Sequence, residues 1–300
     1  MYVKKSIGVF ELLSEHWKAI LGILVFVTST SVVYTTLLRE SIDVSITALS
    51  GFSAAISFFI AFFTAQAYSR WWEARKIWGS FVNDSRSFGR MVMTLFGPAE
   101  RDVPEIQHRL VRRHIAYLYA VKERLRNESP REYTKYLSDE DATRVTGSSN
   151  IGNTILQLQG EDIDAAEREN YIDVIRLAQF NDMLSRFSTS QGMAERIKTT
   201  VFPAYYASMI RVSIWIYILA FPPSLSEEIG FMAIPVSAVL VLFFYLIFSI
   251  GRVMLDPFEG KPHDTPMSSI IRTIEINLLE QIGDDNIPAP LEPIKARYLM

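Results

Sequence analysis

The sequence contains no cysteine, and its formal net charge is only −3 over 300 residues. Disulfides, thiolate metal sites and cysteine nucleophiles are therefore excluded. No basic patch stands out along the chain, so nucleic acid is not an expected partner. Walker A, GxGxxG, GxSxG and HExxH motifs are also missing. These absences predict a protein that is not an enzyme and that needs no metal or cofactor.

The histidines do not point to a metal site either. There are four, and none shows a spacing typical of metal ligands. We therefore expect each to be an ordinary surface or core residue: His16, His108, His114 and His263.

Long apolar runs dominate the chain instead. Hydrophobic residues make up 49% of the sequence, and the mean hydropathy is +0.15 although 21% of residues are charged. About 20 apolar residues suffice for a helix to cross the hydrocarbon core of a bilayer. The runs predict four transmembrane helices, at residues 19–38, 44–69, 201–226 and 229–250. The third helix is expected to end at Pro222-Pro223, because proline interrupts helices.

One cation lies inside the third run. A charge such as Arg211 is costly within a membrane and often functional there. The alternative, which we favour, is that the true membrane span begins later in the sequence. Arg211 would then extend its side chain to the cytoplasmic interface.

Lysine and arginine are distributed unevenly around the four runs. They precede the first run, follow the second, precede the third and follow the fourth, whereas the two short links carry few. Because cytoplasmic loops are enriched in these residues, both termini and the long middle segment are predicted to be cytoplasmic.

The segments outside the runs are predicted to be mostly helical. Residues 103–125 and 165–187 each show apolar side chains at helical spacing, as do residues 268–282. Residues 138–160 are rich in Gly, Ser, Asn and Asp and predict a loop or short helices. The proline-rich tail at 287–293 is expected to be extended.

The second run has three distinct faces when drawn as a helix. Small residues form one face (Ser50, Ser53, Ser57, Ala61 and Thr64), which suits close helix packing. Large apolar residues form another, which can meet acyl chains (Phe52, Ile56, Phe59 and Phe63). The third is a stripe of Ala54, Phe58 and Phe62. Periodicity alone leaves open whether this stripe packs in a core or faces a pore.

Four short motifs carry a resemblance to a known family. The first is Arg70-Trp71-Trp72-Glu73-Ala74-Arg75, followed by Trp78-Gly79 and Asn83-Asp84-Ser85-Arg86. The others are residues 196–203 (RIKTTVFP), Asp256-Pro257-Phe258 and residues 272–278 (RTIEINL). In this order, on a profile of four apolar runs, they closely resemble the bestrophin family in its bacterial form.

This resemblance implies an all-α homopentameric ion channel with a helical cytoplasmic region. Family members line a narrow membrane neck with three apolar residues of the second span, which correspond here to Ala54, Phe58 and Phe62. Ala54 is smaller than the bulky residue common at its position, which suggests a wider outer ring. The resemblance places a second, cytoplasmic constriction near Ile175.

Calcium regulation is not expected. Animal bestrophins bind calcium with an acidic run after their Asn-Pro-Phe. Here only Glu259 and Asp264 remain acidic in the corresponding stretch, with Lys261 between them. A calcium site needs six to eight oxygen ligands.

The resemblance makes passive conduction of chloride or other monovalent anions across a bacterial inner membrane the expected function. A sodium or potassium channel of the same fold remains an alternative, as does a membrane scaffold that conducts nothing. We expect one integrated channel domain built from four segments: the N-terminal segment with two membrane helices (1–69), cytoplasmic helices (70–200), two further membrane helices (201–251), and a C-terminal helix with the tail (252–300). The expected partners are identical subunits, the lipid bilayer and the permeant ions.

Overall fold

The computed structural model describes residues 13–39, 45–97, 103–200, 202–294 and 297–300. The described residues form helices and connecting segments, with one isolated bridge between Ile294 and Tyr298. The all-α class is as expected. The chain divides into two compact units. We call Lys4–Arg70 with Val201–Leu255 the apolar unit, and Trp71–Thr200 with Asp256–Met300 the polar unit.

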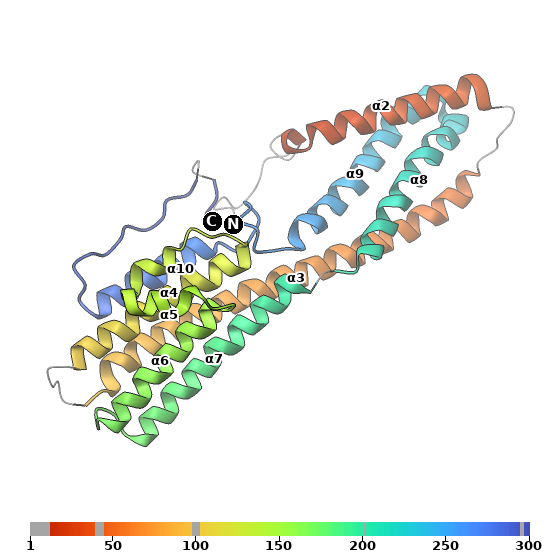
Figure 1. Ribbon diagram of the computed structural model, residues 1–300. Coiled ribbons are helices and arrows are strands. Elements are labelled where there is room, and N and C mark those ends of the chain that lie inside the picture. The colour runs from red at the N-terminus through yellow and green to blue at the C-terminus, as the bar shows by residue number, and fades with distance from the viewer. Residues whose placement is uncertain (1–12, 40–44, 98–102, 201, 295–296) are drawn as a thin grey trace. The chain divides into compact units, whose positions relative to one another are not determined.

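The apolar unit is a bundle of long helices (Figure 1). Helix α2 packs against both of the later helices of the unit, and these two pack against each other. The fully buried side chains Val27, Phe63 and Val241 belong to the apolar core between them. The elements are α2 (Trp17–Val33), the π-helix η1 (Tyr34–Leu38), the first part of α3 (Ile46–Leu95), α8 (Ala204–Ile229), η3 (Gly230–Met232) and α9 (Ala233–Met254).

Three stretches of the described helices are long and apolar enough to cross a membrane: Trp17–Leu38, Ile46–Leu95 and Ala204–Met254. The last comprises 51 residues and contains both α8 and α9, joined by η3. About 20 residues suffice for one crossing, so this stretch has the length of two.

Proline does not end α8, contrary to our expectation. Pro222 and Pro223 both lie inside the helix, which continues to Ile229. The hydroxyls of Ser224 and Ser226 donate to backbone carbonyl oxygens four residues earlier, at 3.1 and 2.7 Å, and so bond carbonyls in the proline-containing turns. The helix ends instead at Gly230, whose φ of +58° favours glycine.

Helix α3 is a single element that belongs to both units. Its 50 residues make it about 75 Å long, more than twice the thickness of a hydrocarbon core. It runs through Arg70-Trp71-Trp72-Glu73 without a break.

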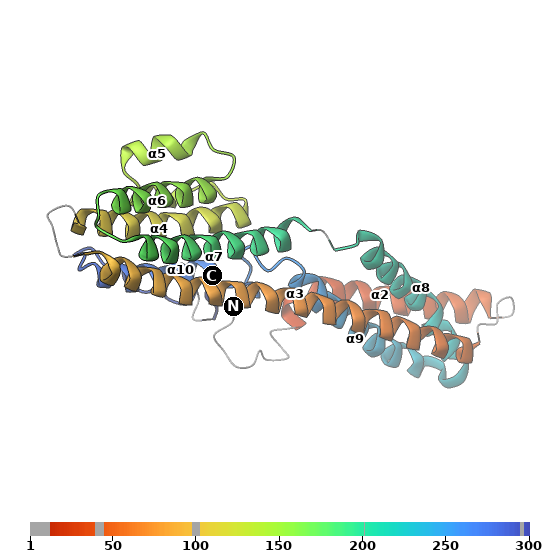
Figure 2. The same cartoon turned by 90° about the horizontal axis from the view of Figure 1, so that it is seen from below.

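The polar unit is built around α4. This helix packs against α6, α7 and α10, and α5 lies outermost next to α6 (Figure 2). Leu110 and Ile115 of α4 are fully buried in the core that these helices share. The elements besides the second part of α3 are α4 (Val103–Arg126), the 3-10 helix η2 (Glu132–Tyr136), α5 (Asp139–Thr146), α6 (Ile151–Arg168), α7 (Val174–Thr199) and α10 (Met267–Gln281).

Most expected segments of the polar unit are confirmed, but one is wrong. The helices predicted at 103–125 and 268–282 are α4 and α10. The stretch 138–160, predicted as a loop or short helices, contains the short α5 but also the start of α6, which has 18 residues. The helix predicted at 165–187 is interrupted. Asn170 has a left-handed φ of +60°, and the Asp173 carboxylate accepts a hydrogen bond from the Arg176 amide at 2.8 Å, which starts a new helix.

Candidate functional site

One face of α3 is uncovered within the apolar unit. Phe58 is 67% exposed and Phe62 47% exposed, and Ala54 is exposed as well. The opposite side of the helix is buried, with Ile60 only 2% exposed. The stripe found from periodicity is therefore not part of the core of its own subunit. We call Ala54, Phe58 and Phe62 the neck face.

Two of the four residues on the face expected to meet acyl chains lie in the core instead, whereas Phe59 of that face is 45% exposed. Ile56 is 2% exposed and Phe63 is fully buried. The Phe63 ring lies 5.2 Å from that of Phe248 and 5.3 Å from that of Phe202. A Cβ atom placed on Gly251 would lie only 2.8 Å from the Phe63 ring, so the small glycine permits this close approach. The interpretation of these two residues was wrong because the sequence alone does not show which side chains of other helices pack against them.

Tyr206 of α8 supports the neck face from one side. Its ring meets those of Phe62 and Phe59 edge to face, with centroids 5.8 and 6.0 Å away. Its hydroxyl donates to the Phe59 carbonyl oxygen at 3.4 Å. The sequence analysis did not single out this tyrosine, and no spacing marks it. The Phe58 ring meets that of Phe59 at 6.0 Å and is the more exposed of the two neck phenylalanines.

Three serines of the small face beside the neck face form hydrogen bonds within their own helix. Ser50, Ser53 and Ser57 each donate to a backbone carbonyl oxygen three or four residues earlier, at 2.7 to 2.9 Å. A hydroxyl bonded in this way can lie in apolar surroundings without an unpaired group. This face can therefore pack closely against another helix.

Ile175 lies at the beginning of α7 and is 71% exposed; its neighbour Val174 is 66% exposed. The Asp173 cap fixes this first turn of the helix. The pair is unusual for the polar unit, where most large apolar side chains are buried.

The four family motifs contact one another within the polar unit. Glu73 of the first motif pairs with Arg196 of the second at 2.7 Å, and Asp256 of the third pairs with Lys198 of the second at 2.6 Å. Arg86 of the first donates to the Asn277 side chain in the fourth at 3.1 Å. These residues therefore hold together segments that are distant in the sequence.

Other motif residues support the same framework. The indole of Trp71 donates to the His263 carbonyl oxygen at 2.9 Å. Ser85 forms a hydrogen bond with His114, Nε2 to Oγ, at 2.8 Å, and Asp84 pairs with Arg186. Neither Arg70 nor Trp72 is fully buried: Trp72 is 47% exposed and stacks on Trp71 with centroids 6.2 Å apart.

The loop that follows Asp256-Pro257-Phe258 has each acidic side chain engaged by the protein. Phe258 is fully buried and its amide donates to Asp256 at 3.1 Å. Glu259 pairs with Lys261, and the Asp264 carboxylate accepts from the Lys261 amide at 2.9 Å. Burial raises the pKa of Asp264 above its ordinary value. Among the described residues, no group of three acidic or histidine side chains is placed to hold a metal ion.

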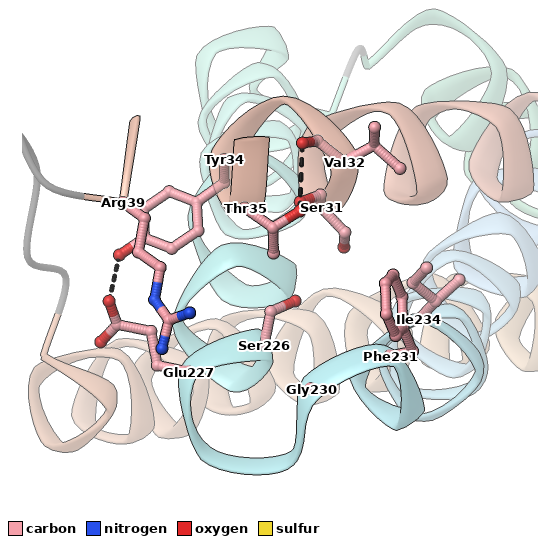
Figure 3. A pocket seen from close by; sticks show the side chains of 10 residues that line it. All are labelled: Ser31, Val32, Tyr34, Thr35, Arg39, Ser226, Glu227, Gly230, Phe231 and Ile234. Atoms are coloured by element: carbon pink, nitrogen blue, oxygen red, sulfur yellow. Dashed lines mark hydrogen bonds between the residues drawn. The ribbon is translucent and has the colours of Figure 1, made fainter. Parts of the chain in front are cut away.

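A small cavity lies near the ends of α2 and α8 (Figure 3). Its volume is about 190 Å³. Tyr34 donates to the Glu227 carboxylate at 2.5 Å and so joins the two helices, while Phe231 and Ile234 form the apolar side. The contact explains why Tyr34, in the π-helix, is 3% exposed.

The fold and the neck face of α3 together define a class of protein. It is an all-helical protein with helices long and apolar enough to cross a membrane, and one of these helices has exposed aromatic side chains. The chain matches the family described as Bacterial/Fungal Bestrophin protein over residues 10–280. It is 30% identical to the voltage-dependent anion channel-forming protein YneE of Escherichia coli K12, over 80% of this chain and 77% of that protein. It is 25% identical to the voltage-dependent anion channel-forming protein mll4386 of Mesorhizobium japonicum, over 81% and 76% of the two chains.

A solved structure agrees with these relatives. The crystal structure of a bacterial bestrophin homologue from Klebsiella pneumoniae superposes with a TM-score of 0.84 at 25% identity, over 89% of this chain and 98% of that one. The chain therefore belongs to the bestrophin family, as its motifs indicated. Members of this family are membrane ion channels and not enzymes.

Proposed function

We propose that the chain forms a homopentameric channel that passively conducts monovalent anions, with the neck face of α3 turned toward the central axis. The observation that carries this proposal is the exposure of Phe58 and Phe62 opposite a fully packed side of the same helix. Large apolar side chains that stay uncovered in one subunit need a lipid, protein or pore environment.

The neck-face side chains of the subunits would together form a constriction around the pore. Ion passage would then depend on whether water fills this constriction and on its diameter. The neck face offers no charge, and the backbone groups behind it are engaged in the helix. Such a constriction is a hydrophobic gate, not a coordinating filter. The aromatic ring of Phe62 is supported by that of Tyr206, so in our proposal Phe62 is the more rigid of the two phenylalanines. Ala54 forms a wider outer ring.

We infer that the permeant ions are anions from the names of similar proteins. The similar proteins of Escherichia coli and Mesorhizobium japonicum are named as anion channel-forming. Aromatic rings favour anions when their edges face the pore and cations when their faces do. A sodium or potassium channel with the same neck is therefore the alternative. Reversal potentials of the purified protein across a salt gradient in a planar bilayer distinguish the two.

The same proposal gives the chain four membrane crossings: α2, the first part of α3, α8 and α9. We further propose that this membrane is the bacterial inner membrane and that both termini and the polar unit are cytoplasmic, which the distribution of lysine and arginine supports. Ile175 would form the second constriction on that side.

The decisive experiment measures ion flux from liposomes that contain the wild type, Phe58→Ala or Phe62→Ala. Both variants should conduct more than the wild type, because each removes a ring from the constriction. Phe243→Ala is the matched control, since Phe243 is 58% exposed in the same unit but lies on α9, outside the neck face. Unchanged flux in both neck variants would contradict the neck assignment.

Two further measurements test whether the protein conducts ions and how many subunits it has. A scaffold predicts no flux from the wild type under any gradient. A pentamer predicts a solubilised complex of five times the 34.2 kDa chain mass, after bound detergent is subtracted. Another multiple would refute the proposed stoichiometry even if ions pass.

A further inference from the structure

A groove lies between α2, α8 and α9 of the apolar unit, away from the neck face of α3. Its volume is about 400 Å³, and its lining is mostly apolar. The floor is formed by buried side chains, among them Ile218 at 3% exposure and Phe248 at 4%. Its walls include Gly22 and Phe26 of α2, Arg211 and Trp215 of α8, and Tyr245 and Arg252 of α9.

The groove carries two positive charges and no carboxylate. Arg211 and Arg252 are both exposed at its wall, and no hydrogen bond or ion pair joins either guanidinium to another described residue. An arginine within an apolar helical stretch is costly unless a counter-charge accompanies it. Since the described protein supplies none, the structure leaves room for an anionic ligand.

The charges lie at one end of the groove. Arg211 is in the second turn of α8 and Arg252 is in the last turn of α9. From Arg211 the lining continues along α8 to Ile218, about 10 Å further along the helix axis. A ligand that fits this pattern has an anionic head and a long apolar tail.

The walls fit a lipid in two further respects. A Cβ atom placed on Gly22 would meet nothing within 4 Å, so the groove is open beside α2 where a side chain is missing. Trp215 and Tyr245 combine apolar rings with a polar group, the residue types enriched where lipid headgroups meet acyl chains.

We propose that this groove binds an anionic phospholipid. Its phosphate pairs with Arg211 and Arg252, and part of one acyl chain lies along Gly22 and Phe26 toward Ile218. Arginine suits phosphate because its planar guanidinium donates two parallel hydrogen bonds. Basic pockets between membrane helices are known to bind lipid headgroups in this way. The proposal requires the apolar unit to lie in a membrane, but not that the protein conducts ions.

Native mass spectrometry of the full-length protein, solubilised in detergent, tests the site. The probes are phosphatidylglycerol, phosphatidylcholine with the same acyl chains, and water-soluble glycerol phosphate. Wild-type protein should retain phosphatidylglycerol preferentially. Each of Arg211→Gln and Arg252→Gln should weaken retention roughly fivefold, the contribution of one basic residue near an anionic lipid.

Gly22→Leu gives a second route that keeps both arginines. Its side chain fills the open part of the groove and should also reduce retention of phosphatidylglycerol. Arg39→Gln is the matched control, because Arg39 lies at the other end of α2 and lines a different cavity. It should bind as the wild type does.

Three outcomes would overturn the proposal. Equal retention of the two phospholipids by the wild type would show that the charge is not recognised. Unchanged retention in Gly22→Leu and in both arginine variants would place the lipid elsewhere, for example because a neighbouring subunit covers the groove. Displacement of the lipid by glycerol phosphate at similar concentration would identify a soluble phosphate as the ligand. Should the arginine variants not fold, selective thermal stabilisation of the wild type by phosphatidylglycerol, absent in Gly22→Leu, decides the question.

Discussion

Helix α3 allows the two units to be compared within one continuous element. Its buried side is alike in both: Ile60 and Phe63 are packed in the apolar unit, and Trp78 and Phe88 in the polar unit. Its exposed side differs more. It presents phenylalanines in the apolar unit and arginines such as Arg86 and Arg90 in the polar unit. The buried side thus holds the subunit together in both environments, whereas the exposed side is suited to the surroundings of each.

The units also differ in how they use charge. Ion pairs run through the interior of the polar unit; Arg113, for example, is 8% exposed and pairs with Asp141 at 2.7 Å and Asp162 at 2.8 Å. In the apolar unit the arginines of the groove have no such partner among the described residues. Buried charge is therefore paired within the polar unit, whereas the two groove arginines have no protein partner among the described residues.

The strongest test of this comparison sets a buried against an exposed phenylalanine of α3. Phe88 is fully buried, with its ring 4.9 Å from that of His114 and 5.8 Å from that of Phe187. Phe88→Ala should cost about 3–5 kcal/mol of unfolding free energy, because it leaves a cavity in the core. Phe58→Ala should leave stability nearly unchanged and alter ion flux instead. Urea midpoints measured by pulse proteolysis check both variants, and equal losses would abolish the distinction between the two sides.

A tighter test concerns the close approach of α9 to α3. Gly251→Ala adds a Cβ atom 2.8 Å from the buried Phe63 ring, which cannot move easily between its aromatic neighbours. We expect a loss of about 1–3 kcal/mol, the usual cost of overpacking. Gly51→Ala is the control, since a Cβ atom there meets nothing within 4 Å. Thermal unfolding in detergent should separate the variants, and a stable Gly251→Ala protein would show that this contact is looser than described.

The polar unit should also respond to acid through one histidine. His114 is fully buried, and burial lowers its pKa to about 3 from an ordinary value of 6.5. Between these two pH values the unfolded chain binds a proton at this histidine and the folded chain does not. The contribution of His114 to the free energy of unfolding is therefore fully present above pH 6.5 and is lost as the pH falls toward 3. The slope from this residue alone is about 1.4 kcal/mol per pH unit.

His114→Gln removes that proton and should flatten the dependence of the urea midpoint between pH 6.5 and 5, whatever its effect at neutral pH. The half-buried His108 provides the matched variant, His108→Gln, which keeps the slope. An unchanged slope in the His114 variant would mean that other groups cause the acid sensitivity.

The sequence predicts some elements well because their apolar spacing has one interpretation. Helix α4 has nearly the predicted bounds, and Leu110, Ile115 and Leu118 are fully buried, although the helix also buries charged side chains such as Arg113 and Lys122. The break between α6 and α7 could not be found in this way, because Asn170 and Asp173 interrupt a pattern whose apolar spacing continues on both sides. Propensity for a turn competes there with periodicity, and the turn prevails.

The candidate site, too, was only partly predictable from periodicity. Periodicity identified the stripe of Phe58 and Phe62 as a separate face, and the family resemblance supplied its proposed role. Periodicity could not tell which apolar face packs inside the subunit, since Ile56 and Phe63 are as hydrophobic as the neck residues. That choice depends on partners from elsewhere in the chain, such as Gly251 and Tyr206. The two arginines of the groove come together only once α8 and α9 are folded.

The smallest effect on ion flux is expected at Val174 and Ile175 of α7, a pair of exposed apolar side chains in the polar unit. Ile175→Ala widens the proposed cytoplasmic constriction but leaves the Asp173 cap and the packed side of the helix intact. Ion flux should therefore rise less than in Phe62→Ala, and stability should be unaffected. Val174→Ala is the matched control, because Val174 is 66% exposed on the adjacent position of the same turn. If both α7 variants alter flux equally, the constriction is not specific to Ile175; if Ile175→Ala exceeds Phe62→Ala, the narrowest point of the pathway lies at α7 and not in the neck.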